Sequence, residues 1–78
     1  MNEIESKVKE ILCDKLDVSP DVLTNEANIK EDLGGDSLDI VEIEMELENE
    51  LNIEITDEKL SQVETVGDLI KLAEESSK

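Results

Sequence analysis

The apolar residues of this chain recur every three or four positions in three stretches, which is the spacing of one helix face. The first stretch predicts a helix over residues 3–16, with Asn2 as its N-cap and Glu5 in its first turn. The second, SLDIVEIEMELENEL, predicts a helix that starts near Ser37. The third, TVGDLIKLAEES, opens on Thr65 with an acid three residues later, which is a capping-box pattern. We therefore expect three main helices.

A long irregular segment, DVSPDVLTNEANIKEDLGG, joins the first two of these helices. Ser19-Pro20 marks a short turn, and Gly34-Gly35 marks a tight start to the second helix. Connections of about 20 residues without regular structure are uncommon in compact domains, and they usually have a function. Apolar residues spaced along this one predict a loop that packs on the core: Val22, Leu23, Ile29 and Leu33.

The segment between the second and last helices is shorter. NIEI is expected to be extended, and TDEKLSQ predicts a short helix with Thr56 as its cap. The pattern as a whole gives three main helices and one short one.

The second helix is apolar on two faces. At about 100° per residue, Leu38, Val41 and Met45 form a stripe roughly 150° away from the other apolar stripe. A domain this small cannot cover both faces, so we expect this outer stripe to be exposed. Flanked by acids, it has the composition of a docking surface for basic proteins, although long glutamate stems or a sandwiched helix would also account for it. The stripe expected to face the core comprises Ile40, Ile43, Leu47 and Leu51.

Composition removes most enzyme classes. The chain has no Phe, Tyr, Trp or His, so it lacks the parts of a Ser-His-Asp triad, a histidine-ligated metal or an aromatic base-stacking surface. Seven basic and 23 acidic residues give a formal net charge of -16, which repels nucleic acid and anionic lipid and attracts basic proteins. The same charge favours a monomer.

The lone Cys13 excludes an internal disulfide, and we expect it to be a buried or half-buried helix residue. No apolar run is long enough to span a bilayer, and the N-terminus lacks a signal-peptide pattern. We therefore expect a cytoplasmic protein that does not insert into membranes. No segment matches the calcium loop of an EF-hand, so no specific metal site is predicted. An enzyme is disfavoured because the carboxylates are dispersed and no nucleophile–base pair is evident.

Asp36-Ser37 stands where the long loop meets the second helix. Local chemistry is satisfied if Asp36 is the N-cap and Ser37 is a polar first-turn residue. A modified Ser37 is the functional alternative, because a phosphate ester there would lie at a helix N-terminus, where free N–H groups and the helix dipole favour negative charge.

The segment LGGDSLDIVEIEMELENEL, residues 33–51, resembles the signature of acyl carrier proteins, in which an Asp-Ser-Leu motif begins the second helix of a four-helix bundle. The similarity covers nearly the whole chain, since the amphipathic first helix, the long first loop, the short helix after IEITDE and the last helix opening on TVGDL all match. The resemblance implies one all-α domain, residues 1–78, folded as a four-helix bundle with three main helices, a short third helix and a long first loop.

In function, the resemblance implies a carrier rather than an enzyme. Ser37 would take a 4′-phosphopantetheine arm from coenzyme A through a separate phosphopantetheinyl transferase, with Asp36 helping to present it. The arm would hold acyl groups as thioesters and shuttle them between enzymes of fatty acid biosynthesis. The residues that would meet basic docking patches on these acyl-processing enzymes are Leu38, Asp39, Val41, Glu42, Met45 and Glu48.

The absence of aromatic residues suits a bundle that parts to admit an alkyl chain. The candidates for lining such a cavity, which could equally be plain core, are Ile29, Leu33, Ile43, Leu47, Leu51, Ile55, Val63 and Leu69.

The chain departs from the family pattern at a few positions. Gly35 stands where fatty-acid carriers often have alanine, which leaves carriers of polyketide, peptide or D-alanyl pathways open as alternatives. Glu44 stands where an apolar residue is common, so we expect the cavity mouth or the docking rim to differ there. An unmodified acidic helical adaptor remains the alternative from another class.

Overall fold

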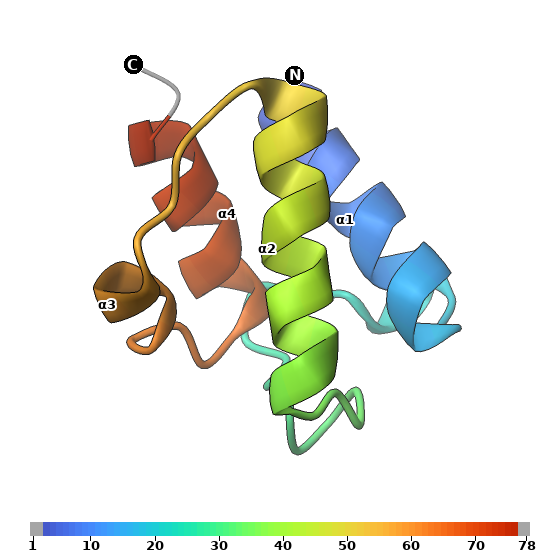
Figure 1. Cartoon of the computed structure of the whole chain (residues 1–78). Helices are drawn as coiled ribbons and strands as arrows, with labels where there is room; N and C mark the ends of the chain where they lie inside the picture. The colour runs from blue at the N-terminus through green and yellow to red at the C-terminus, as the bar shows by residue number, and fades with distance from the viewer. Residues whose placement is uncertain (1–2, 77–78) are drawn as a thin grey trace.

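The computed structural model describes residues 3–76, which form α-helices and one short 3-10 helix and no β-strand (Figure 1). This confirms the predicted all-α fold, with three long helices and a short third one. The predicted N-cap Asn2 lies outside the described residues. The elements are α1 (Glu3–Leu16), η1 (Pro20–Val22), α2 (Ser37–Leu51), α3 (Asp57–Leu60) and α4 (Val66–Ser76).

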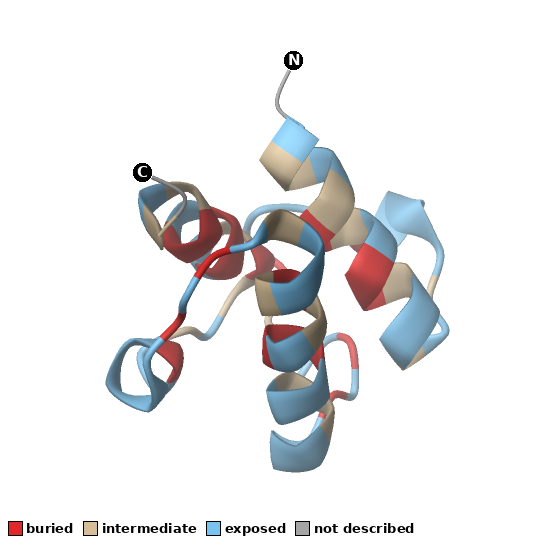
Figure 2. Cartoon of the chain, turned by 45° about the horizontal axis from the view of Figure 1, so that its top comes forward, coloured by how far each residue is buried: buried red, intermediate tan, exposed pale blue. Residues whose placement is uncertain are grey.

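In the view of Figure 1, helix α2 lies in front, with α1 to its right and α3 and α4 to its left. The core is built from α1, α2 and α4, each of which has buried and exposed stretches (Figure 2). Within it, α1 packs against both α2 and α4. Helix α3 is only one turn long and buries a single side chain, Leu60. The fully buried aliphatic side chains at the centre are Val8, Leu12, Ile29, Ile43, Leu47, Val66 and Leu69.

Capping boxes fix where α2 and α4 begin. The Asp36 carboxylate accepts a hydrogen bond from the backbone N–H of Asp39 at 3.0 Å, and the Asp39 carboxylate accepts one from that of Asp36 at 3.2 Å. At α4, the Thr65 hydroxyl oxygen accepts from the N–H of Asp68 at 3.1 Å, and the Asp68 carboxylate accepts from that of Thr65 at 3.2 Å. Each pair satisfies backbone donors that the helix itself leaves free.

The short third helix has the cap that was predicted, because the Thr56 hydroxyl oxygen accepts from the backbone N–H of Lys59 at 3.2 Å. Before it, α2 ends at Leu51, and its C-cap Asn52 adopts the left-handed conformation with φ 56°. The next residues lie outside any regular element, and the Glu48 carboxylate accepts from the backbone N–H of Ile55 at 2.9 Å. Glu48 therefore ties the chain after α2 back to the helix.

The long first loop is packed, as predicted, and backbone bonds fasten it to the segment before α4. The N–H of Ile29 donates to the carbonyl of Glu64 at 2.9 Å, and the N–H of Val66 donates to the carbonyl of Ala27 at 2.9 Å. A third bond joins the N–H of Gly67 to the carbonyl of Asn25, so close that a side-chain carbon at Gly67 would lie 2.9 Å from that oxygen.

One predicted anchor of this loop is wrong. Leu23, Ile29 and Leu33 are buried, but Val22 is exposed. The reason is that Val22 ends the single 3-10 turn, which brings only the following Leu23 against the core.

Candidate functional site

Ser37 is the first residue of α2 and is exposed. Among residues 3–76, no side chain or backbone group hydrogen-bonds its hydroxyl, whereas its neighbour Asp36 is engaged as the helix cap. The hydroxyl therefore lies free at the N-terminus of a 15-residue helix. Ser37 also borders a cavity of about 400 Å³, whose other lining residues are Lys30, Ile40, Val41, Asp57, Leu60, Ser61 and Val63.

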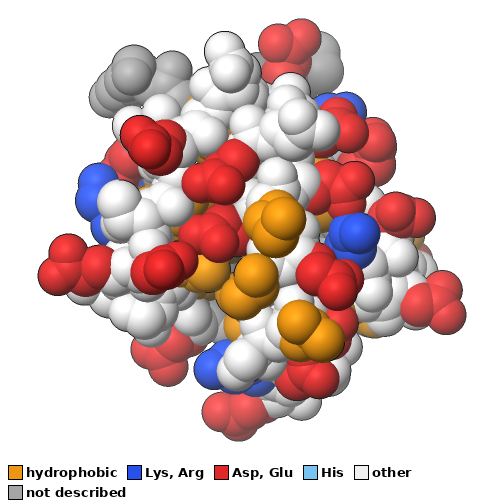
Figure 3. Space-filling model, in the orientation of Figure 1, with side chains coloured by type: hydrophobic (Ala, Val, Ile, Leu, Met, Phe, Trp, Pro, Cys, Tyr) orange, Lys and Arg blue, Asp and Glu red, His pale blue; other side chains and the backbone are white. Residues whose placement is uncertain are grey.

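The outer stripe of α2 is exposed, which confirms that part of the sequence analysis. The exposed fractions are 66% for Leu38, 43% for Val41 and 61% for Met45. These residues make up an apolar strip on α2, and Figure 3 shows the hydrophobic side chains on this face with acidic side chains around them. Neither glutamate stems nor another helix covers the strip.

The acids expected to flank the strip differ in what they do. Asp39 and Glu48 each accept a backbone hydrogen bond within the chain, at the start and after the end of α2. Glu42 is exposed on the same helix. The sequence analysis assigned all three to partner binding and missed the structural bonds, which depend on how the flanking segments fold back.

Two ion pairs join α1 to α2, and neither was foreseen. Lys15 pairs with Glu46 at 3.2 Å, and Lys7 pairs with Glu50 at 3.2 Å. Hydrogen bonding to these carboxylates raises the pKa of each lysine. The spacing of the charges in the sequence could have indicated these pairs. The two lysines are two turns apart on one helix, and they can face acids one turn apart on a helix that crosses it.

Glu44 is the exception among the acids of α2. Only 6% of its surface is exposed, and its Oε2 has no hydrogen-bond partner within residues 3–76. Burial raises the pKa of this carboxyl, and the charges of Glu48 and Asp57 raise it further. The sequence predicts that the cavity mouth or the docking rim differs at Glu44, and the structure buries this residue on the opposite side of α2 from the α1 ion pairs.

The candidates for lining an acyl cavity are all buried in the core or packed against it. Val63 borders the cavity next to Ser37. Leu51 is half-buried and packs on the core. The other six, Ile29, Leu33, Ile43, Leu47, Ile55 and Leu69, are buried in the core. Sequence reasoning missed Ile40 and Leu60 as cavity residues, because their place depends on how α3 lies against α2.

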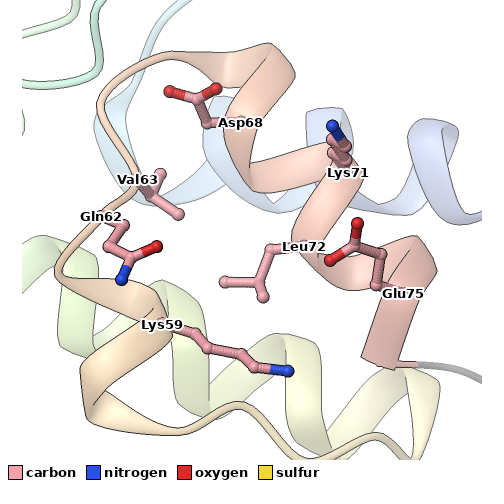
Figure 4. A pocket seen from close by; sticks show the side chains of 7 residues that line it. All are labelled: Lys59, Gln62, Val63, Asp68, Lys71, Leu72 and Glu75. Carbon is pink, nitrogen blue, oxygen red and sulfur yellow. The ribbon is translucent and has the colours of Figure 1, made fainter.

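A second cavity, of about 270 Å³, lies between α3 and α4 (Figure 4). Leu72 extends from α4 into it, and Lys59 runs along its α3 side. Asp68 borders it, but the low pKa of that carboxyl has a structural cause, namely the hydrogen bonds that it accepts from the backbone of Glu64 and Thr65. This cavity does not include Ser37.

Among residues 3–76, no group of three Cys, His, Asp or Glu side chains could hold a metal ion. No helix in the same range is long and apolar enough to cross a bilayer.

Comparison with known proteins shows the family to which this chain belongs. Residues 6–73 match the family described as "phosphopantetheine attachment site". The fold matches a solved structure of an acyl carrier protein from Enterococcus faecalis, with a TM-score of 0.82 and 37% sequence identity over 96% of this chain and 95% of that one. The chain belongs to the acyl carrier protein family.

The residues of this structure fit the group that the family binds. A covalent phosphopantetheine arm needs a hydroxyl that a separate enzyme can reach, and Ser37 is exposed, unbonded and at a helix N-terminus. The departure at Gly35 has a packing reason, because a side-chain carbon there would lie 3.2 Å from both Ile29 and Leu16. Glycine at this position lets the loop close against α1 directly before the motif.

Proposed function

We propose that this chain carries acyl intermediates on a 4′-phosphopantetheine arm attached to Ser37 and passes them between enzymes of fatty acid biosynthesis. The single observation that carries the proposal is the free, exposed hydroxyl of Ser37 at the start of α2, inside the segment that matches the phosphopantetheine attachment family. When bound, the arm supplies a thiol that holds the acyl group as a thioester.

The chain's own part in attachment is to present a hydroxyl and to accommodate a charge. The Ser37 oxygen forms a new ester bond to phosphorus, the pyrophosphate bond of coenzyme A breaks, 3′,5′-ADP leaves, and the transferase takes the hydroxyl proton. The resulting phosphodiester lies at the N-terminus of α2, where the helix dipole favours negative charge. Asp36 holds that first turn in place through its bond to the N–H of Asp39.

The apolar strip on α2 is proposed as the surface that partner enzymes bind. Leu38, Val41 and Met45 offer exposed apolar area next to Ser37, and Glu42 adds negative charge at the side. A net charge of -16 increases the association rate with enzymes that have basic patches. The chain performs no chemistry on its cargo in this scheme.

Intact-protein mass spectrometry after incubation with coenzyme A, Mg²⁺ and a broad-specificity phosphopantetheinyl transferase tests the attachment. We expect a phosphopantetheine-sized mass gain in the wild type and none in Ser37→Ala. Ser61→Ala is the matched control, since Ser61 is also exposed and borders the same cavity. A gain that survives in Ser37→Ala, or no gain in a folded wild type, would disprove the attachment at this residue.

Met45→Glu tests the docking surface. It places a charge in the middle of an apolar contact, so we expect the affinity for the transferase to fall about tenfold or more, or roughly 1.4 kcal/mol. Helical circular dichroism should not change, because Met45 is exposed. Val22→Glu is the control, being an exposed apolar residue away from the strip. Equal losses of affinity in both variants would show that net charge, and not the strip, governs binding.

A further inference from the structure

The cavity next to Ser37 follows one face of α2, and that face continues to a buried acid. At about 100° per residue, Glu44 lies within about 20° of Ser37 around the helix, and Ile40 and Val41 lie on either side of the same line. Ser37, Ile40 and Val41 all border the cavity. Glu44 is therefore the next residue on this face, roughly 10 Å along the helix axis from Ser37.

At the far end of the same face, the backbone that follows α2 is bonded to the helix. Glu48, one turn beyond Glu44, accepts the hydrogen bond from the N–H of Ile55 at 2.9 Å. Glu44 thus lies between an open cavity at one end and a closed seam at the other. Burying a carboxyl without a partner is costly, and such groups in native structures call for an explanation.

Within residues 3–76, no lysine is among the charges that act on Glu44, although Lys30 borders the cavity. The groups that act on it electrostatically are both acids, Glu48 on α2 and Asp57 at the start of α3, and they raise its pKa in addition to the effect of burial. Asp57 also borders the cavity. The walls of the cavity are apolar near Ile40, Val41, Leu60 and Val63, and the region beyond them is acidic.

We propose that Glu44 limits the length of the acyl chain that this carrier can shelter between α2 and α3, so that short acyl groups are preferred. The proposal rests on the function proposed above. Methylenes that lie against Ile40, Val41 and Leu60 are stabilised by leaving water. Methylenes that continue toward Glu44 gain nothing, because they would remove the remaining hydration of a carboxyl that already lacks a partner.

A series of acyl groups of increasing length tests this limit. The transferase can load the carrier from butyryl-, hexanoyl-, octanoyl- and decanoyl-coenzyme A, and mass spectrometry verifies each product. The readout is the Tm of each loaded form. In the wild type we expect Tm to rise with the shortest chains and then level off. In Glu44→Leu we expect it to keep rising, by at most roughly 3 to 6 °C for each newly buried methylene.

Glu54→Leu is the matched control, because it makes the same replacement at an exposed acid and should level off like the wild type. A Tm that rises with every added length in the wild type would overturn the proposal, since the chain would then enter the core without meeting Glu44. A plateau at the same length in Glu44→Leu would overturn it as well. Absence of loading on Ser37, seen by mass, would instead refute the carrier function on which the proposal rests.

Discussion

Helix α2 has acids along its seam with α1 and along its seam with α3. The groups that surround these acids differ between the two seams. Against α1, Glu46 and Glu50 each meet a lysine, at 3.2 Å in both pairs. On the side toward α3 and the segment before it, Glu44 is buried, its Oε2 has no hydrogen-bond partner within residues 3–76, and the charges that act on it are those of two acids, Glu48 and Asp57. The charge of the first seam is balanced, and that of the second is not.

This difference shows that the acidity of α2 has at least two physical roles. On the α1 side, the acids join two long helices, so the like charges one turn apart are compensated across the seam. On the α3 side, a buried acid weakens the packing of a single-turn helix that buries only Leu60.

The largest effect should follow from removing the buried acid. Glu44→Leu replaces an unpartnered carboxyl with an apolar side chain of similar size, so the free energy of unfolding should increase by roughly 1–3 kcal/mol. Urea denaturation followed by circular dichroism measures it. Glu46→Leu, on the balanced seam, should decrease stability because Lys15 loses its partner. Stabilisation by both variants would mean that the seams do not differ.

The pH dependence of the free energy of unfolding should reflect the raised pKa of Glu44. The pKa of Glu44 is raised in the folded state, so between its ordinary value of 4.5 and the folded value the native protein binds more protons than the unfolded chain. Stability is therefore lost as pH rises through the folded pKa, and it is regained as pH falls from neutrality toward 4.5. Asp68 acts in the opposite sense, because its pKa is lowered, but its contribution is lost only at more acidic pH.

Denaturation curves across this range should thus show that mild acid stabilises the wild type more than it stabilises Glu44→Gln. The difference should be small, since one shifted group is responsible. Glu54→Gln serves as the control for the loss of one exposed acid. If Glu44→Gln keeps the full pH response, the response comes from the overall charge and not from Glu44.

The smallest effect is expected on the α1 side. Lys15→Gln should lower Tm by less than Glu44→Leu raises it, because the Lys15–Glu46 pair is partly exposed. The loss should vanish at about 1 M salt, where the screening length is only about 3 Å. Lys30→Gln, at an exposed lysine that has no ion pair within residues 3–76, is the control. A loss that persists in high salt would indicate that packing of the lysine stem, and not its charge, stabilises this seam.

Much of the fold could be predicted because its determinants are local. The helix over residues 3–16, the caps at Thr56 and Thr65 and the exposed strip around Val41 all follow from periodicity and from side chains that bond a backbone group three residues away. Asp36 also has the capping role that its position predicted, although the reciprocal bond from Asp39 was not foreseen.

The rest depended on contacts between distant parts of the chain. The cross-helix partners of Lys7 and Lys15 require the crossing of α1 and α2, and the cavity next to Ser37 requires the position of α3. The helical wheel predicted the side of α2 on which Glu44 lies, but the burial of Glu44 depends on the segments that pack against that side. The role of Ser37 as the attachment residue stays a prediction, supported by the family match over the segment that contains it.

Proteases are commonly expected to cut a native protein in its longest loop, but hydrogen bonds fasten the first loop of this chain to the fold. Three backbone bonds hold residues 25–29 against residues 64–67, so this long connection must break several contacts at once before it can enter a protease active site. Residues 52–63, around α3, form a shorter segment, and the hydrogen bonds that tie it to the rest of the described chain go to Glu48 near the end of α2. Each segment offers one exposed lysine, Lys30 or Lys59, and trypsin would therefore sever the native chain first at the short helix and only later in the longest loop.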